Sequence, residues 1–203
     1  SLKKAGIKIH AGARVSRIES IEDGKRVHFI CGDAEQTLEA ESVCIAIGQK
    51  PFYEGLGLEA CGIKTGNRGI EVDARMRTSI PGIFAAGDIA GKSMLAYVAM
   101  AEGRTAAANA LGMNSVMDYT AIPRCVYGPI ELASVGFTED EALSIGLKVK
   151  CLRSNMAANA SATIQGERRG MVKIVTAEDT GKVIGVHIAG NGASNLIAEC
   201  ALA

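Results

Sequence analysis

The chain has 203 residues, of which 48% are hydrophobic, so it can form one large domain or two small ones around a substantial core. Its 22 Lys and Arg residues balance 22 Asp and Glu residues, which argues against a nucleic acid or an anionic membrane bound through a general basic surface. No apolar run approaches the roughly 20 residues that a membrane-spanning helix needs, and the opening residues have no signal-peptide apolar region. The expectation is therefore a soluble, cytoplasmic protein.

Cysteine and histidine usage predicts no metal site and no local redox pair. None of the six cysteines lies two or four positions from another, which favours scattered reduced thiols over a zinc site or a disulfide framework. The histidines are His10, His28 and His187, and each is expected to be a strand residue rather than a ligand. The cysteines are Cys31, Cys44, Cys61, Cys125, Cys151 and Cys200.

The first part of the chain is predicted to be β-structure. Apolar and polar residues alternate over 14–19 and 26–31, and the turn signal at 22–25 joins these two strands into a hairpin. A third strand near 36–39 would extend the hairpin. The run Val43 to Ile47 is continuously apolar, which is typical of a strand buried on both faces.

The middle of the chain predicts short strands and one long helix. Gly69 to Val72 and Ile83 to Ala86 are short strand candidates. A helix is expected over 94–111, capped by Ser93 and ended by Gly112. Its small residues would allow close packing on a sheet. They are Ala96, Ala99, Gly103, Ala106, Ala107 and Ala110.

The last part of the chain predicts an α+β arrangement. A helix over 139–145 has Thr138 as its cap and Glu141 three residues on, which is a capping-box pattern. Alternating strands over 171–176 and 183–189 form a hairpin, and a closing helix covers 195–202. The composition shift at 117–123 is the predicted domain boundary.

Two glycine-rich segments imitate a dinucleotide-binding loop. Gly55 to Ala60 fits G-x-G-x-x-A, but no strand precedes it and no long helix follows, so the phosphate-binding mechanism has no support. Gly190 to Asn195 follows a strand and precedes a helix but lacks the third glycine. We interpret the second segment as an ordinary strand-to-helix turn.

The stretch "TSIPGIFAAGDIAGKSMLAY" places Asp88 directly after a predicted buried strand. In α/β folds this position binds ligands, and a carboxylate there can accept hydrogen bonds from sugar or ribityl hydroxyls. Gly87 permits close approach of a ligand to the backbone, and the following helix directs free N–H groups toward it. The alternative is that Asp88 is a helix N-cap or a turn residue without a ligand.

The whole pattern from Thr78 to Asp88 resembles the second flavin-binding motif of the FAD-dependent pyridine nucleotide–disulfide oxidoreductases. Three further segments have the order and spacing of the same family. "AIGQKP" at 46–51 is similar to the segment that closes its NAD(P)H domain, and "YTAIPRCVYGPIELASVG" at 119–136 to the start of its interface domain. "GVHIAGNGASNLIA" at 185–198 is similar to a later interface segment, and the dihydrolipoamide dehydrogenases are the most similar group.

The resemblance implies a set of cofactor-binding residues and no catalytic residue in this chain. Asp88, beside Gly87, would bind the ribityl–phosphate side of FAD. The backbone of Met94, Leu95, Ala96 and Tyr97 would face the pyrimidine edge of the flavin ring, and Gly48 and Val15 would line the NAD pocket. For Val15, the alternative is an ordinary inward-facing strand residue.

Some positions depart from the dihydrolipoamide dehydrogenase pattern. Tyr97 stands where that group usually has His, and a Tyr there also resembles mercuric reductase. Gln49 replaces a common Arg, and 127–129 departs from the usual Thr or Asp before proline. The family's first FAD-binding glycine motif, its C-x-x-x-x-C disulfide and its NAD loop normally precede this region, and its catalytic His-Pro normally follows.

The resemblance therefore implies an internal piece of a flavoenzyme with an α/β, Rossmann-like part followed by an α+β interface domain. Residues 1–73 would end the NAD(P)-binding domain, 74–116 would be the returning FAD-domain segment, and 117–203 the truncated interface domain. The parent enzyme would be a homodimer that oxidises dihydrolipoamide with NAD through FAD. Its substrate would be a lipoyl-bearing protein or a small dithiol. The isolated chain would be inactive. A mercuric reductase or NADH peroxidase relative and a non-catalytic dimerisation module are the alternatives.

Overall fold

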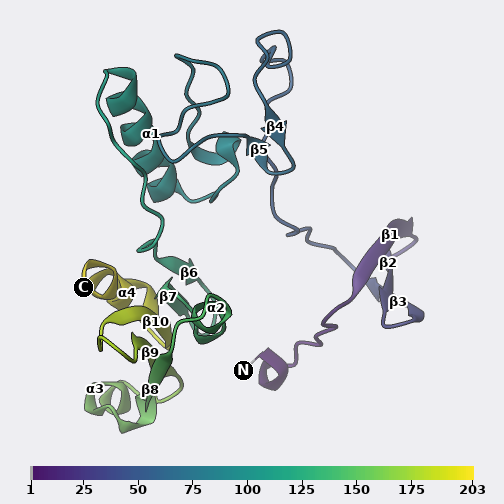
Figure 1. Ribbon diagram of the computed structural model, residues 1–203. Helices are drawn as coiled ribbons and strands as arrows, with labels where there is room; N and C mark the ends of the chain where they lie inside the picture. The colour runs from purple at the N-terminus through teal and green to yellow at the C-terminus, as the bar shows by residue number, and fades with distance from the viewer. Residues whose placement is uncertain (1) are drawn as a thin grey trace. The chain divides into compact units, whose positions relative to one another are not determined.

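The computed structural model describes residues 2–203, and the chain divides into two compact units with the boundary in the sequence between Gln49 and Lys50. The first unit contains a short 3-10 helix, η1 (Leu2–Ala5), and an antiparallel sheet of three strands (Figure 1). The strands are β1 (Arg14–Ile21), β2 (Gly24–Cys31) and β3 (Ala34–Ala40), in the order β1-β2-β3. The predicted hairpin and its third strand are therefore confirmed.

Phe29 is the buried centre of this first sheet, with 5% of its surface exposed. It pairs with Val15 across β1 and β2, and the His10 ring meets it edge-on with 5.1 Å between the ring centroids. His28 lies in β2 as predicted, and His187 lies in a strand of the second unit. The prediction was wrong for His10, which lies in the loop before β1, where its ring packs on Phe29.

The strand predicted over Val43 to Ile47, buried on both faces, is not formed. These residues have no regular secondary structure, and Ile45 and Ile47 are 69% and 92% exposed. A strand is stable in the interior of a sheet only when neighbouring strands satisfy its backbone N–H and C=O groups. The described residues contribute no such neighbours to this segment, so its apolar pattern does not produce a strand here.

The second unit begins with long irregular segments around a few short elements. These are β4 (Thr65–Gly66), β5 (Gly69–Ile70), the 3-10 helix η2 (Gly87–Ala90) and α1 (Ala96–Ala110). The strand predicted over Gly69 to Val72 shortens to the two residues of β5, which pair with β4. The strand predicted at Ile83 to Ala86 is reduced to a single bridge between Phe84 and Arg77.

Helix α1 confirms the predicted long helix, but its first turn begins later than predicted. Leu95, not Ser93, is the N-cap residue, and no side chain caps this end. Gly112 ends the helix as predicted, with φ at +84° and its N–H donating to the Asn109 carbonyl over 3.0 Å. The small residues do not pack on a sheet as expected: the main partner of α1 is η2.

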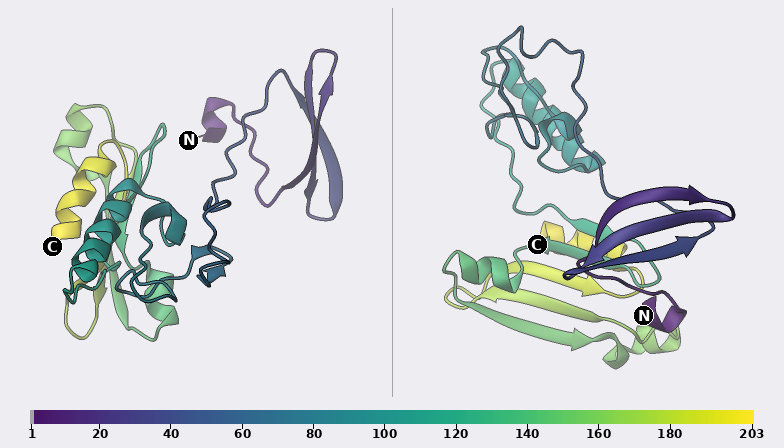
Figure 2. Two further views of the ribbon diagram at one scale, coloured as in Figure 1. Left: turned by 90° about the horizontal axis from the view of Figure 1, so that it is seen from above. Right: turned by 90° about the vertical axis from the view of Figure 1, so that its right-hand side faces the viewer.

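The rest of the second unit is a five-stranded antiparallel sheet in the order β6-β7-β10-β9-β8, with helices packed against it (Figure 2). Helix α4 packs on β7 and β10, and together they bury Val135, Val186, Ile188 and Ile197. The strands are β6 (Arg124–Val126), β7 (Leu132–Gly136), β8 (Val149–Asn155), β9 (Met171–Ala177) and β10 (Val183–Ala189). The helices are α2 (Glu139–Ser144), η3 (Met156–Ala158), α3 (Ala160–Ile164) and α4 (Ala193–Leu202).

The local predictions for this part are confirmed. Glu141 N–H donates to the Thr138 hydroxyl, and the Glu141 carboxylate accepts from the Thr138 N–H, which is the capping box predicted for α2. The β9–β10 hairpin and the closing helix α4 are also present. Gly190 and Gly192 form the predicted strand-to-helix turn, and Gly192 is the N-cap of α4 with φ at +73°.

The N-terminus of α4 is held by a carboxylate from another segment. Glu131 accepts hydrogen bonds from the Ser194 backbone N–H at 3.0 Å and from the Ser194 hydroxyl at 2.8 Å. No side chain within α4 caps this end, so Glu131 supplies the missing acceptor. These two donors lower the pKa of Glu131 below its usual 4.5.

We expect Glu131→Gln to destabilise the chain at pH 7 and to remove part of its acid sensitivity. A carboxylate with a lowered pKa in the folded state stabilises above its unfolded pKa of 4.5, and this contribution is lost as the pH falls through the folded value. The difference between wild type and variant should therefore shrink below about pH 4.5. Urea denaturation at pH 7, 5, 4 and 3 measures this, with exposed Glu178→Gln as the control. A difference that stays constant with pH would contradict the cap.

All six cysteines are free thiols. Among residues 2–203, no helix combines the length and the apolar content needed to span a bilayer.

Candidate functional site

The turn at Gly87 lies between an irregular segment and helix α1. Hydrogen bonds from Ala85 N–H to the Met76 carbonyl, at 3.1 Å, and from Thr78 N–H to the Ile83 carbonyl, at 3.0 Å, fix the segment that precedes the turn. Gly87 has φ at +78°, and a Cβ there would lie 3.2 Å from the Ala99 Cβ. Glycine is therefore favoured by the backbone conformation, and a Cβ there would crowd the approach of η2 to α1.

Asp88 is the second residue of η2, and its side chain is exposed. Its carbonyl accepts from the Gly91 N–H at 3.0 Å. The N-cap alternative for Asp88 was wrong, because Ala86 is the N-cap of η2 and Leu95 that of α1. Within residues 2–203 the Asp88 carboxylate takes part in no hydrogen bond, so both oxygens remain able to accept from a ligand hydroxyl.

The start of α1 presents backbone donors without a side-chain cap. Leu95 is extended, and the first turn contains no acidic residue. The first N–H groups of a helix have no acceptor within the helix, and the helix dipole adds partial positive charge at this end. Met94 and Tyr97, at either side of the cap, are 37% and 44% exposed. The backbone N–H groups of Leu95, Ala96 and Tyr97 therefore have no acceptor within the helix, and Met94 lies just before them.

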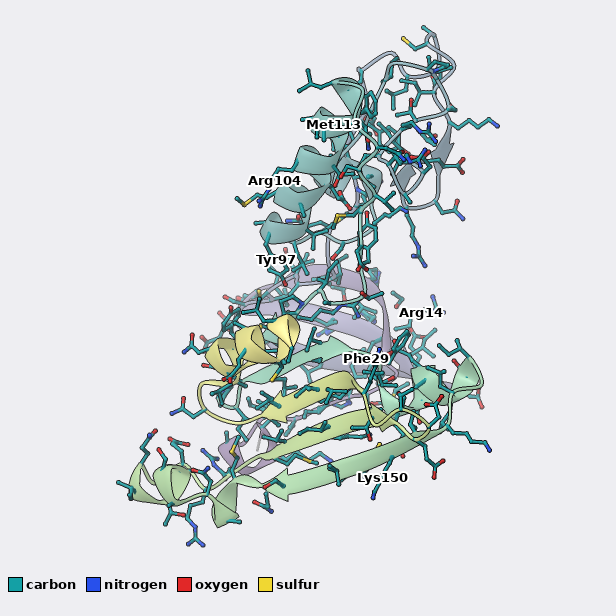
Figure 3. All side chains as sticks on the ribbon, turned by 60° about the vertical axis from the view of Figure 1, so that its left-hand side comes forward. Arg14, Phe29, Tyr97, Arg104, Met113 and Lys150 are labelled. Atoms are coloured by element: carbon teal, nitrogen blue, oxygen red, sulfur yellow. The ribbon has the colours of Figure 1, made fainter. Side chains whose placement is uncertain are left out.

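The Tyr97 side chain points toward the chain segment that leads into β6. Figure 3 labels Tyr97 in the first turn of α1, and its hydroxyl donates a hydrogen bond to the Pro123 carbonyl. Burial, followed by the charges of Cys125 and Tyr127, raises the pKa of this hydroxyl. The backbone of Tyr97 is thus at the helix end, whereas its side chain fixes the segment before β6.

Sequence reasoning missed Glu102, which is fully buried in α1 and accepts a hydrogen bond from the Gly87 N–H at 2.6 Å. Its neighbours on the buried helix face are Val98 and Thr105. Their spacing of four and three residues puts all three on one side of the helix. An acidic residue centred in this otherwise apolar or uncharged stripe was the signal that could have identified it.

An open cavity of about 720 Å³ lies beside η2. Ala90, Gly91, Lys92 and Ser93 line one side of it. The other polar lining residues are Asn67, Arg68, Glu71, Tyr119 and Arg124. Three cationic side chains and one carboxylate line the cavity, so their net positive charge favours a ligand that carries negative charge.

The two predicted NAD-pocket residues lie in the first unit. Gly48 is exposed, with φ at +87°, in the irregular segment after the predicted strand. Val15 lies in β1, next to an irregularity in the pairing between Val15 and Arg17, and is 56% exposed. The alternative of an ordinary inward-facing strand residue was therefore wrong for Val15.

Comparison with protein families assigns both parts of the chain. Residues 1–103 match the pyridine nucleotide-disulphide oxidoreductase model, and residues 122–203 match the dimerisation domain of the same group. The chain therefore belongs to the pyridine nucleotide-disulphide oxidoreductase family. This confirms the predicted family and the predicted fold class, a nucleotide-binding α/β part followed by an α+β dimerisation domain.

Curated relatives are named dihydrolipoyl dehydrogenase. The chain is 39% identical to the protein from Thermus scotoductus and 40% identical to that from Geobacillus stearothermophilus, with all of the chain covered in both. The matched region is 44% and 43% of the length of these two relatives. The chain thus spans less than half the length of the curated relatives it matches.

Solved structures agree with this assignment. The chain superposes on LpdA from Mycobacterium tuberculosis with a TM-score of 0.90 at 32% identity, covering 99% of this chain and 44% of that protein. It also superposes on a form of RclA, an HOCl-induced flavoprotein disulfide reductase from Escherichia coli, with a TM-score of 0.86 at 26% identity. That match covers 99% of this chain and 45% of RclA.

Proposed function

We propose that this chain is part of a dihydrolipoyl dehydrogenase that oxidises dihydrolipoamide with NAD. Dihydrolipoyl dehydrogenases from several bacteria, each matched over the whole chain, support this choice within the family. The observation that carries the proposal is the turn at Gly87, where the exposed carboxylate of Asp88 in η2 and the uncapped end of α1 belong to two elements that pack together.

The residues at this turn suit FAD. The Asp88 carboxylate would accept from ribityl hydroxyls, and Gly87 keeps the backbone close to α1. The backbone N–H groups at the start of α1 would face the pyrimidine edge of the flavin and stabilise negative charge there. A helix-end charge effect of about 1–2 kcal/mol would shift a two-electron potential by about 20–40 mV. When bound, FAD supplies the hydride acceptor and the two-electron chemistry.

The chain contributes to three parts of the proposed enzyme. Residues 1–73 would end the NAD-binding domain, where Gly48 and Val15 line the NAD pocket. Residues 74–116 would return to the FAD domain, and residues 117–203 would form the interface domain. The dimerisation-domain match over residues 122–203 supports the last of these.

The proposed enzyme acts as a homodimer on a lipoyl-bearing protein or a small dithiol. The dimerisation-domain match supports association with a second copy. Six free cysteines fit a reducing compartment, which supports a cytoplasmic location. The redox disulfide and the catalytic base would lie outside these 203 residues, because the resemblance assigns neither to any position of the chain.

The test compares the 203-residue chain with the complete reading frame that contains it. The purified complete protein is expected to carry FAD, shown by its visible absorbance, and to reduce NAD when dihydrolipoamide is supplied. The 203-residue chain is expected to give no NAD-linked turnover, since thiol exchange needs a dithiol and a base to activate it.

Other outcomes would contradict the proposal in distinct ways. Turnover by the 203-residue chain would show that the catalytic groups lie within it. A complete protein that carries FAD but oxidises NADH with mercuric ion or peroxide, and not lipoamide, would assign it to a relative with other chemistry. A protein that dimerises without binding flavin would leave only a dimerisation module.

A further inference from the structure

Glu102 is a buried carboxylate that the proposed chemistry does not use. None of its surface is exposed, although acidic side chains are rarely buried without partners. Its Oε2 atom accepts from the Gly87 N–H at 2.6 Å, and its Oε1 atom accepts from the Tyr119 hydroxyl at 2.6 Å. One carboxylate thus joins the turn at Gly87 to the segment that leads into the dimerisation domain.

Both donors are needed to keep a carboxylate in this position. Burying a charged group is costly unless it is paired or hydrogen-bonded, and hydrogen bonds to a charged acceptor are short and strong. The Gly87 N–H has no alternative acceptor within a 3-10 helix that starts at that residue. Glu102 therefore satisfies the first donor of η2 and fixes the backbone immediately before Asp88.

Tyr119 is held firmly in the donor role. Burial raises the pKa of Tyr119, and the hydrogen bond and charge of Glu102 raise it further, so the hydroxyl keeps its proton. The hydroxyl also lies 4.0 Å from the Met76 sulfur, and the Lys92 ammonium lies 5.4 Å from the ring centroid. Contacts on several sides therefore fix the orientation of the ring.

Met76 shows that the surrounding structure imposes a strained conformation at this point. It is fully buried and is the one non-glycine residue with positive φ, +62°, in the described chain, residues 2–203. A bulky residue adopts this backbone conformation only where its neighbours determine it. Its carbonyl accepts from the Ala85 N–H, two residues before Gly87, so Met76 and Glu102 hold the same turn from two directions.

We propose that Glu102 is the positioning residue of the Gly87–Asp88 turn and that Tyr119 holds Glu102 in place. The segment leading into the dimerisation domain thereby sets the position of Asp88 and its affinity for the ligand. The effect on FAD rests on the proposed function, whereas the effect on the Gly87 backbone does not. Tyr97 adds a second connection between α1 and this segment, through the Pro123 carbonyl.

The first experiment measures amide hydrogen exchange by NMR in the 203-residue chain. A hydrogen bond to a charged group changes an equilibrium about tenfold or more, so Tyr119→Phe and Glu102→Met should speed Gly87 exchange by about tenfold. Exchange of the Ala99 N–H, which donates to the Leu95 carbonyl, serves as the reference within α1 and should change less than about threefold. Glu102→Gln should retain most of the protection, because its amide can accept from Gly87 and donate to Tyr119.

Two matched controls test whether the faster exchange of the Gly87 N–H is specific to Tyr119 and Glu102, or follows the loss of any tyrosine hydroxyl or carboxylate. Tyr127→Phe removes a hydroxyl from a side chain that is 76% exposed, and Glu178→Gln neutralises an exposed carboxylate. Neither should alter Gly87 exchange. Unchanged Gly87 exchange in both Tyr119→Phe and Glu102→Met, or a rise that Ala99 shares equally, would overturn the proposal.

The second experiment measures FAD dissociation in the complete protein. Tyr119→Phe should raise the dissociation constant about tenfold relative to Tyr127→Phe. If the wild type binds FAD and Tyr119→Phe binds it equally well, the positioning role is wrong. If the wild type binds no FAD, the proposed function fails instead, and Gly87 exchange still decides whether Glu102 positions the turn.

Discussion

Replacing Gly91 by alanine is expected to lower the free energy of unfolding of the chain by about 3 kcal/mol, from an unfavourable backbone conformation and from overpacking. Gly91 follows η2 with φ at +64°, and a Cβ there would lie 1.6 Å from the Arg68 carbonyl oxygen. The atom in the way is backbone, so no side-chain rotation can relieve the clash. The Arg68 segment and η2 must move apart, which also deforms the cavity that Arg68 and Gly91 line.

Gly112→Ala is the matched control for Gly91→Ala. Gly112 also has positive φ, +84°, but a Cβ there meets nothing within 4 Å. The free energy of unfolding of this variant should therefore fall only by the cost of the backbone conformation, about 1 kcal/mol. Urea denaturation followed by circular dichroism measures both. An equal decrease in the free energy of unfolding of the two variants would show that Gly91 and the Arg68 carbonyl do not approach each other this closely in solution.

Ile197→Ala is expected to destabilise the five-stranded sheet and its helix by about 3 kcal/mol. Ile197 is 2% exposed and packs from α4 on Val135, Val186 and Ile188 of the sheet, so truncation removes buried apolar contacts and leaves a cavity. The loss should appear as a lower urea midpoint with an unchanged dependence on urea concentration.

Leu202→Ala in the same helix is the control for Ile197→Ala. Leu202 is 91% exposed, so its truncation should change stability by less than about 0.5 kcal/mol. If Ile197→Ala were as mild as Leu202→Ala, α4 would not be packed on this face of the sheet. A large loss in both variants would mean that the end of α4 is also buried in solution.

Local patterns in the sequence determined most of the elements. The capping box at Thr138 and Glu141 depends on residues three positions apart, and the β9–β10 hairpin depends on the alternation within each strand. Interactions of this kind are complete within a short segment, so they form wherever that segment is folded. The ordered motif from Thr78 to Asp88 likewise identified the family before any tertiary contact was known.

Tertiary structure decided the features that depend on distant segments. Val43 to Ile47 has the composition of a buried strand, but a strand needs hydrogen-bonding neighbours, and no local pattern can supply them. Leu95, and not Ser93, is the cap residue of α1, so the capping preference of a single residue did not determine where its first turn begins. Glu102 has the sequence character of an exposed helical residue, and only the approach of Gly87 and Tyr119 from two other segments makes its burial stable.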